Sequence, residues 1–118
     1  MVFTASLFIR VVGLGETSFY GDETKVFYLD KTVPAVRFLL DQRKGPVQFL
    51  AAWVVEKFVG YYDEFYTRLP FAIAGFLSVL IFYLLSKKLF NKNVALVSTL
   101  LFSFSGFNVA FSRTVQYQ

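Results

Sequence analysis

Two uncharged stretches decide the fold: LPFAIAGFLSVLIFYLLS at residues 69–86 and NVALVSTLLFSFSGFNVAFS at residues 93–112. A helix of about 20 mainly apolar residues is long enough to span the hydrocarbon core of a bilayer. We therefore predict transmembrane helices over residues 69–88 and 93–112. The alternative is a pair of helices buried in a soluble core, but a chain of 118 residues is too short to bury both on all sides.

The composition supports the membrane class and limits which side chains can act in catalysis. Hydrophobic residues make up 56% of the chain and aromatic residues 20%, whereas a soluble domain averages about 45–50% apolar residues with glycine included. The absence of cysteine excludes disulfide scaffolds and thiol nucleophiles. Because histidine is also absent, carboxylates remain as the acid/base groups near neutral pH. A divalent metal is compatible with these carboxylates, but no ligand spacing indicates one, and we predict no metal site.

The charges indicate the topology. The turn at residues 87–92 contains three lysines and no acid, and short basic loops stay on the cytoplasmic side. Residues 15–68 are therefore placed on the outer or luminal face, and this first outer loop contains all eight acids of the chain together with seven bases. The net charge of +4 thus reflects the inner turn. We expect membrane lipids as partners and no nucleic acid.

Residues 1–14 form an incomplete span. An uncharged run precedes Arg10, whereas a signal peptide has its positive charge before the apolar run. We interpret residues 1–14 as the outer end of a first transmembrane helix whose inner half is missing. The alternative is that the protein genuinely begins with this short apolar segment.

The first outer loop carries two helical signals. Apolar residues recur at intervals of three or four, which predicts one face of a helix, at Val26, Leu29, Val33, Val36 and Leu40. Pro34 removes a backbone donor within this run, so we expect it to bend or divide the helix. Pro46 suits the first turn of a second helix. Residues 47–59 are apolar on most sides but too short to span, which is typical of an interfacial helix.

An acidic pair, Asp22-Glu23, follows the first helix. A carboxylate near the membrane surface can deprotonate a hydroxyl acceptor if its position is fixed. The alternative is helix capping, because Asp is a favoured N-cap residue. The pair Asp63-Glu64 has the same chemistry, and composition alone does not choose between the two pairs.

Cations flank the same loop. Lys44 stands at the entrance of the predicted interfacial helix, where a lysine can bind a lipid phosphate; a solvated turn is the alternative. Arg113 and Gln116 follow the last span and return to the outer face beside this loop. Arg113 is equally compatible with a side chain that extends to the interface and anchors the helix end.

The order of these motifs is recognisable over nearly the whole chain. Residues 10–23 end in an Asp-Glu pair, residues 44–47 (Lys-Gly-Pro-Val) approximate a Lys-Pro-Pro-Leu entry, residues 68–70 read Arg-Leu-Pro, and residues 112–117 follow a Ser-Arg-x-x-x-Tyr pattern. The chain thereby resembles polyprenyl-phosphate-dependent glycosyltransferases of the glycosyltransferase C superfamily. The nearest branch contains the dolichyl-phosphate-mannose-protein mannosyltransferases and the aminoarabinose lipid A transferases. Gly45 departs from this pattern where the family often has a proline.

The resemblance implies an all-α, multi-pass protein of the cell membrane with interfacial helices in the first outer loop. It also implies inverting transfer of a sugar from a polyprenyl-phosphate donor to a hydroxyl of a protein or lipid acceptor at the outer face. Asp22 would be the general base, and Glu23 would orient the acceptor or help set the pKa of Asp22. The predicted substrate-binding residues are Lys44, Arg113, Gln116 and Tyr117. This order favours Asp22-Glu23 over the second acidic pair.

Members of this family have many more membrane spans, so we expect the chain to be the N-terminal part of a glycosyltransferase, an incomplete single domain that is inactive alone. The alternative from another class is a small non-catalytic membrane protein, such as an accessory subunit. A transporter fragment is less favoured, because neither long stretch contains the intramembrane charge that marks a substrate pathway.

Overall fold

The computed structural model describes residues 1–19, 21, 23–29, 31–41 and 46–115. Within these ranges the chain is all-helical, as predicted, and contains no strand. The elements in order are α1 (Val2–Val11), the 3-10 helix η1 (Glu23–Val26), α2 (Ala35–Asp41), α3 (Pro46–Val59), α4 (Glu64–Leu89), α5 (Lys92–Ser103) and α6 (Gly106–Ser112).

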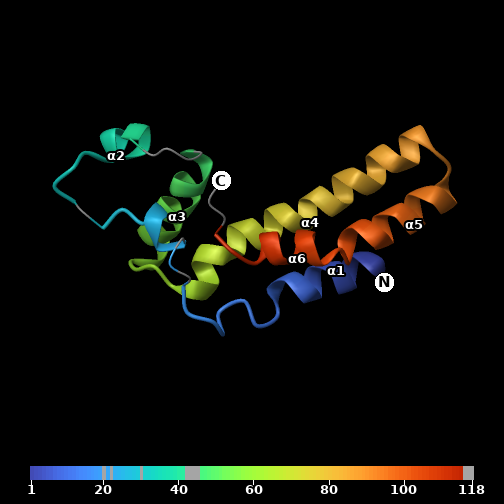
Figure 1. Cartoon of the computed structure of the whole chain (residues 1–118), viewed down its shortest axis with the longest axis horizontal. Coiled ribbons are helices and arrows are strands. Elements are labelled where there is room, and N and C mark those ends of the chain that lie inside the picture. The colour runs from blue at the N-terminus through green and yellow to red at the C-terminus, as the bar shows by residue number, and fades with distance from the viewer. Residues whose placement is uncertain (20, 22, 30, 42–45, 116–118) are drawn as a thin grey trace.

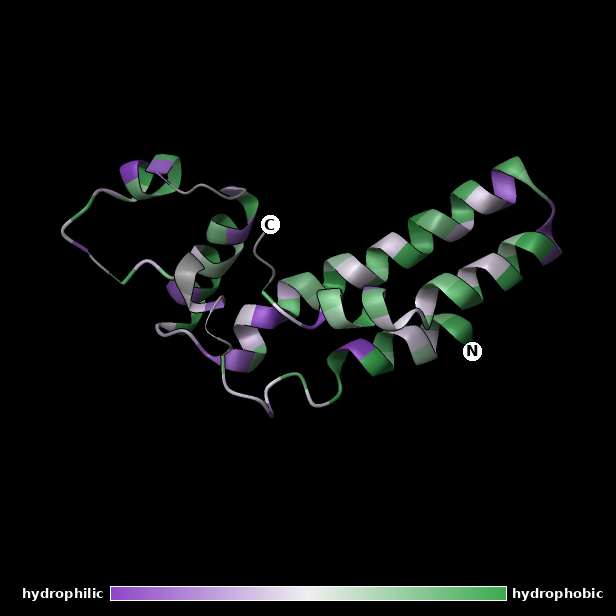
Figure 2. Ribbon diagram, in the orientation of Figure 1, coloured by the Kyte–Doolittle hydropathy of each residue, from purple (hydrophilic) through white to green (hydrophobic). Residues whose placement is uncertain are grey.

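The molecule is elongated, measuring 55 × 29 × 23 Å along its principal axes. Helices α1, α5 and α6 pack along α4, while α2 and α3 lie toward the opposite end with the connecting loops (Figure 1). Figure 2 shows mainly apolar residues along α4 and α5, with hydrophilic residues at the turn between them and around the start of α4. Within α4 and α5 the hydrophilic residues therefore concentrate toward the two ends of α4.

Helix α4 is the one described helix long and apolar enough to cross a membrane, judged by its length and composition. It contains the predicted span and begins five residues before it, at Glu64. The side chain of Asp63 explains this earlier start, because it accepts hydrogen bonds from the backbone N–H groups of Phe65 (3.1 Å) and Tyr66 (3.2 Å). Asp63 is therefore an N-cap residue.

The predicted helix over residues 93–112 is divided. Helices α5 and α6 are bent by 60° at a short break, although together they have the length and apolar character of a second span. Backbone groups around the break form local hydrogen bonds. The Phe104 N–H donates to the Leu100 carbonyl (3.2 Å), and the side-chain amide of Asn108 donates to the Phe102 carbonyl (3.2 Å). Serine and glycine at residues 103–106 are weak helix formers, which favours the break at this point.

The predicted helix over residues 26–40 is wrong in its first half. Only Ala35–Asp41 forms an α-helix, preceded by the short 3-10 helix and irregular chain. Pro34 divides the run rather than bending it, because its carbonyl accepts from the Phe38 N–H (3.0 Å) and so stands at the start of α2. Helix α3 begins at Pro46 as predicted.

Tertiary contacts hold the irregular part of the first outer loop against α3 and the start of α4. The rings of Phe27 and Tyr62 stack with centroids 4.2 Å apart. Phe27 is buried together with Ala52 of α3 and Val115, which follows α6. This small core fixes the first outer loop over one end of the bundle.

Candidate functional site

A buried ion pair joins the first outer loop to the first turns of α4. Arg68 Nη2 lies 2.6 Å from Glu23 Oε2, and Arg68 Nε donates to Glu23 Oε1 at 3.0 Å. Both residues are only 3% exposed. The contact is bidentate, the geometry in which an arginine and a carboxylate bind each other most strongly.

The same guanidinium organises the loop that follows α1. Arg68 Nη1 donates to the carbonyls of Leu14 (3.0 Å) and Thr17 (2.8 Å) and to the Thr17 hydroxyl (3.1 Å), while Nη2 donates to the Ser18 carbonyl (3.2 Å). Because Arg68 binds Glu23, three backbone carbonyls and one hydroxyl, it is the centre of the site's hydrogen-bond network. The sequence motif places this arginine only at the start of a span, and its part in the site was not predicted.

The chain that leaves α6 closes onto the same carboxylate. The Val115 N–H donates to Glu23 Oε1 at 2.9 Å. Two residues earlier, Arg113 Nη1 donates to the Ile9 carbonyl of α1 at 2.6 Å. The ends of α1 and α6, the start of α4 and the first outer loop therefore converge on Glu23 and Arg68.

A cavity of about 500 Å³ lies at this convergence. Its wall contains two guanidinium groups, two carboxylates and several hydroxyls, contributed by Gly13, Leu14, Glu16, Thr17, Ser18, Glu23, Arg68, Ala110, Arg113 and Thr114. Cationic and hydroxyl groups of this kind bind phosphate oxygens and sugar hydroxyls. The cavity is therefore suited to a polar ligand with hydroxyl or phosphate oxygens, at one end of an apolar bundle.

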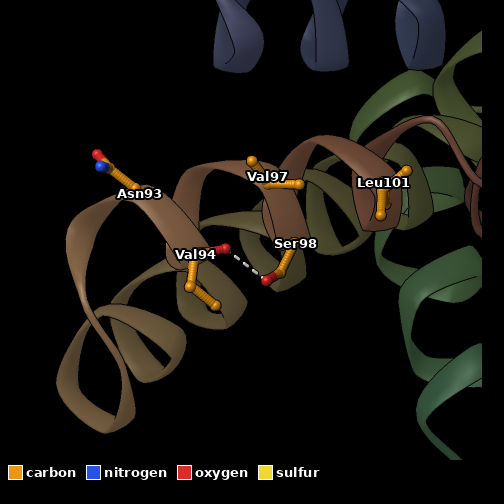
Figure 3. A pocket seen from close by; sticks show the side chains of 5 residues that line it. All are labelled: Asn93, Val94, Val97, Ser98 and Leu101. Atoms are coloured by element: carbon orange, nitrogen blue, oxygen red, sulfur yellow. Dashed lines mark hydrogen bonds between the residues drawn. The ribbon is translucent and has the colours of Figure 1, made fainter.

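A second depression of about 500 Å³ lies along α5 and does not have this chemistry. Figure 3 shows its five lining side chains, Asn93, Val94, Val97, Ser98 and Leu101, all on one helix. The one hydroxyl among them already donates to the Val94 carbonyl (2.5 Å). With apolar side chains and no charged group in its wall, this depression suits hydrocarbon rather than a reacting phosphate.

The structure brings together two of the predicted site residues, Glu23 and Arg113, in the wall of the same cavity. The other predicted site residues, Asp22, Lys44, Gln116 and Tyr117, lie outside the described residues. Among the residues that the structure describes, no group of three acidic side chains could hold a metal ion.

A polar contact ties the first outer loop to α3. Lys31 Nζ lies 2.6 Å from Glu56 Oε1, and this hydrogen bond raises the pKa of Lys31 above its ordinary value. The Tyr28 N–H donates to the Tyr62 hydroxyl at 2.9 Å. Burial raises the pKa of Tyr62. These bonds fasten the irregular part of the first outer loop to α3 and to the residues that join α3 to α4.

Comparison with known proteins identifies the family. The family model described as dolichyl-phosphate-mannose-protein mannosyltransferase matches residues 43–118, which contain α3 to α6 with Arg68 and Arg113. Neither a curated protein nor a solved structure matches the chain. Because the matched range covers more than half of the sequence, the chain belongs to the dolichyl-phosphate-mannose-protein mannosyltransferase family, whose members are membrane glycosyltransferases.

Proposed function

We propose that this protein transfers a sugar, with inversion, from a polyprenyl-phosphate donor to a hydroxyl of a protein or lipid acceptor at the outer face of the cell membrane. One observation carries the proposal: Glu23, held by Arg68 and by the Val115 N–H, stands in the wall of a polar cavity that Arg113 also lines. The residue before Glu23 in the sequence is Asp22, a carboxylate suited to act as the base.

The proposed reaction is a single displacement. The Asp22 carboxylate removes the proton of the acceptor hydroxyl, and the hydroxyl oxygen bonds to the anomeric carbon from the face opposite the phosphate. The bond between the anomeric carbon and the phosphate oxygen breaks, and polyprenyl phosphate leaves with the electron pair. A single attack from the opposite face inverts the anomeric configuration.

Cations at the cavity support departure of the phosphate. Arg113 lines the cavity wall, and a guanidinium group offsets the charge that develops on a leaving phosphate. We propose that Lys44 contributes a second positive charge and that Gln116 and Tyr117 contact the donor. None of these roles requires a metal ion.

The role that we propose for Glu23 is to position Asp22 rather than to remove a proton. Both of its oxygens bond to Arg68, and one also accepts the Val115 N–H. A carboxylate engaged in this way is well placed to fix the backbone of its neighbour, so we propose that Glu23 positions Asp22 for catalysis.

The exposed apolar side chains favour placement in a membrane. Val36 and Leu40 of α2 are 68% and 76% exposed, and Val47 and Phe58 of α3 are 73% and 87% exposed. We propose that α4 and the α5–α6 pair span the bilayer while α2 and α3 lie at its outer interface. The cavity then lies at headgroup depth, where the phosphate of a lipid-linked donor is found.

The donor class is testable with membranes that contain the full-length protein. Parallel reactions receive a radiolabelled sugar linked to polyprenyl phosphate or the same sugar linked to a nucleotide, with hydroxyl-bearing peptide or lipid as acceptor and with or without EDTA. We expect transfer from the lipid-linked donor alone, and we expect this transfer to persist in EDTA and to invert the anomeric configuration. The reactions with peptide and with lipid acceptor show which class of acceptor is used. Transfer from the nucleotide sugar alone, or retention of configuration, would contradict the proposal.

A further inference from the structure

Gly75, in the middle of α4, lies where two other helices meet it. A Cβ atom placed on Gly75 would stand 2.3 Å from Ser112 Cβ and 3.2 Å from Ser112 Oγ, at the end of α6. It would also lie 3.5 Å from Arg10 Nε of α1. Since real Cβ atoms do not approach another carbon to 2.3 Å, α6 can hold its position only if residue 75 has no side chain.

The close approach fixes the part of the chain that enters the cavity. Ser112 is the last residue of α6, and the next residue, Arg113, bonds to the Ile9 carbonyl and lines the cavity. The Val115 N–H then bonds to Glu23. A shift of α6 away from α4 would therefore move both contacts together.

We infer that Gly75 is a positioning residue for sugar transfer: its missing side chain seats α6 against α4, which sets Arg113 and the Val115–Glu23 bond in the cavity. This inference rests on the proposed function and extends it to a residue that touches no substrate. The 60° bend between α5 and α6 serves the same end, because it directs the last turn of α6 onto Gly75.

Helix propensity alone predicts that replacing Gly75 with alanine does no harm, which is the opposite of what the positioning role predicts. Alanine is a stronger helix former than glycine in a helix interior. If Gly75 had only a local role, Gly75→Ala would therefore leave α4 at least as stable and transfer unchanged. The positioning role instead predicts a loss of transfer that depends on the side chain at residue 112.

The test compares Gly75→Ala, Ser112→Gly and the double variant in membranes that contain the full-length protein. We expect Gly75→Ala to lower kcat/KM for the lipid-linked donor about 10- to 100-fold, because small displacements of catalytic groups have effects of this order. Ser112→Gly removes both atoms closest to the new Cβ, so the double variant should recover the kcat/KM of Ser112→Gly alone. Ala74→Ser adds one atom to an exposed residue next to Gly75 in α4, so it is the matched control and should retain activity.

A distance measurement makes the inference independent of activity. The sequence contains no cysteine, so spin labels can be attached to cysteines introduced at the exposed positions Phe58 on α3 and Phe107 on α6. We expect Gly75→Ala to shift the distance distribution between the labels and the double variant to restore it. Ser112→Leu enlarges the same contact from the α6 side and is expected to shift the label distance in the same way. It replaces Gly75→Ala in this measurement if Gly75→Ala inserts poorly into the membrane.

The outcomes separate this inference from the proposed function. Wild-type protein that transfers no sugar from the lipid-linked donor would overturn both. Active wild-type protein with unchanged kcat/KM in Gly75→Ala, an unshifted label distance in both enlarging variants, or a double variant that does not recover, would overturn the positioning role alone.

Discussion

Replacing Arg68 with methionine should destabilise the end of the bundle that holds the cavity. The substitution keeps an unbranched side chain of similar reach but removes the partner of Glu23, which is 3% exposed. It also removes the donors to the Leu14, Thr17 and Ser18 carbonyls. The buried carboxylate would then lose the guanidinium that binds both of its oxygens.

The magnitude follows from the burial. Removing one partner of a buried ion pair costs about 3–5 kcal/mol, chiefly because the remaining charge is uncompensated. We therefore expect Arg68→Met to lower the free energy of unfolding by at least about 3 kcal/mol. The double variant Arg68→Met/Glu23→Met removes the buried Glu23 charge as well, so it should be less destabilised than Arg68→Met alone.

The assay is denaturant unfolding in detergent micelles, followed by circular dichroism. Arg37→Met is the matched control, because Arg37 lies 3.8 Å from Asp41 in a pair whose side chains are 76% and 73% exposed. Such exposed pairs contribute about 0–1 kcal/mol. An Arg68→Met variant no less stable than Arg37→Met would refute the reasoning. A double variant at least as destabilised as Arg68→Met would refute it as well.

Three further results are expected. Asp63→Ala should lower the free energy of unfolding by about 0.5–2 kcal/mol through loss of the α4 cap, and unchanged thermal unfolding would show that the cap is dispensable. The pKa values of Lys31 and Tyr62 are raised in the folded state above their ordinary values of 10.5 and 10.0. The stability that these shifts contribute is therefore complete below the ordinary values and is lost as the pH rises through the folded-state values. The free energy of unfolding, measured at increasing alkaline pH, should show this loss, and Tyr62→Phe should make the loss smaller. Single cysteines at the exposed residues Phe90 and Tyr61 should react with an impermeant thiol reagent from opposite sides of the membrane, and labelling of both from one side would contradict the proposed topology.

Hydropathy and helix signals predicted the all-α architecture, the long span and the start of α3 at Pro46. They missed the break between α5 and α6, because Ser103 to Gly106 is uncharged and apolar enough to continue the pattern. At the break the Asn108 side chain donates a hydrogen bond to the Phe102 carbonyl, a contact that hydropathy does not encode. The predicted helix at Val26 failed because long-range contacts, such as the stack of Phe27 on Tyr62, hold the chain in an irregular path.

The candidate site was predictable in part. Acidic and basic residues at the outer ends of the apolar stretches indicated Glu23 and Arg113, and both line the cavity. The role of Arg68 was not predictable from spacing, because its partner Glu23 lies 45 residues away in the sequence. The close contact of Gly75 with Ser112 is likewise a property of helix packing, and no local pattern reports it.

The central claim is that the Asp22 carboxylate activates the acceptor hydroxyl, and one paired measurement tests it most directly. Sugar transfer from a polyprenyl-phosphate donor is measured for Asp22→Asn and for Asp63→Asn, both inserted normally in the membrane. Asparagine caps a helix about as well as aspartate, so Asp63→Asn should retain transfer, whereas Asp22→Asn should lose at least about 100-fold, as expected for removal of a general base. Equal transfer by Asp22→Asn and the wild-type protein would contradict the account.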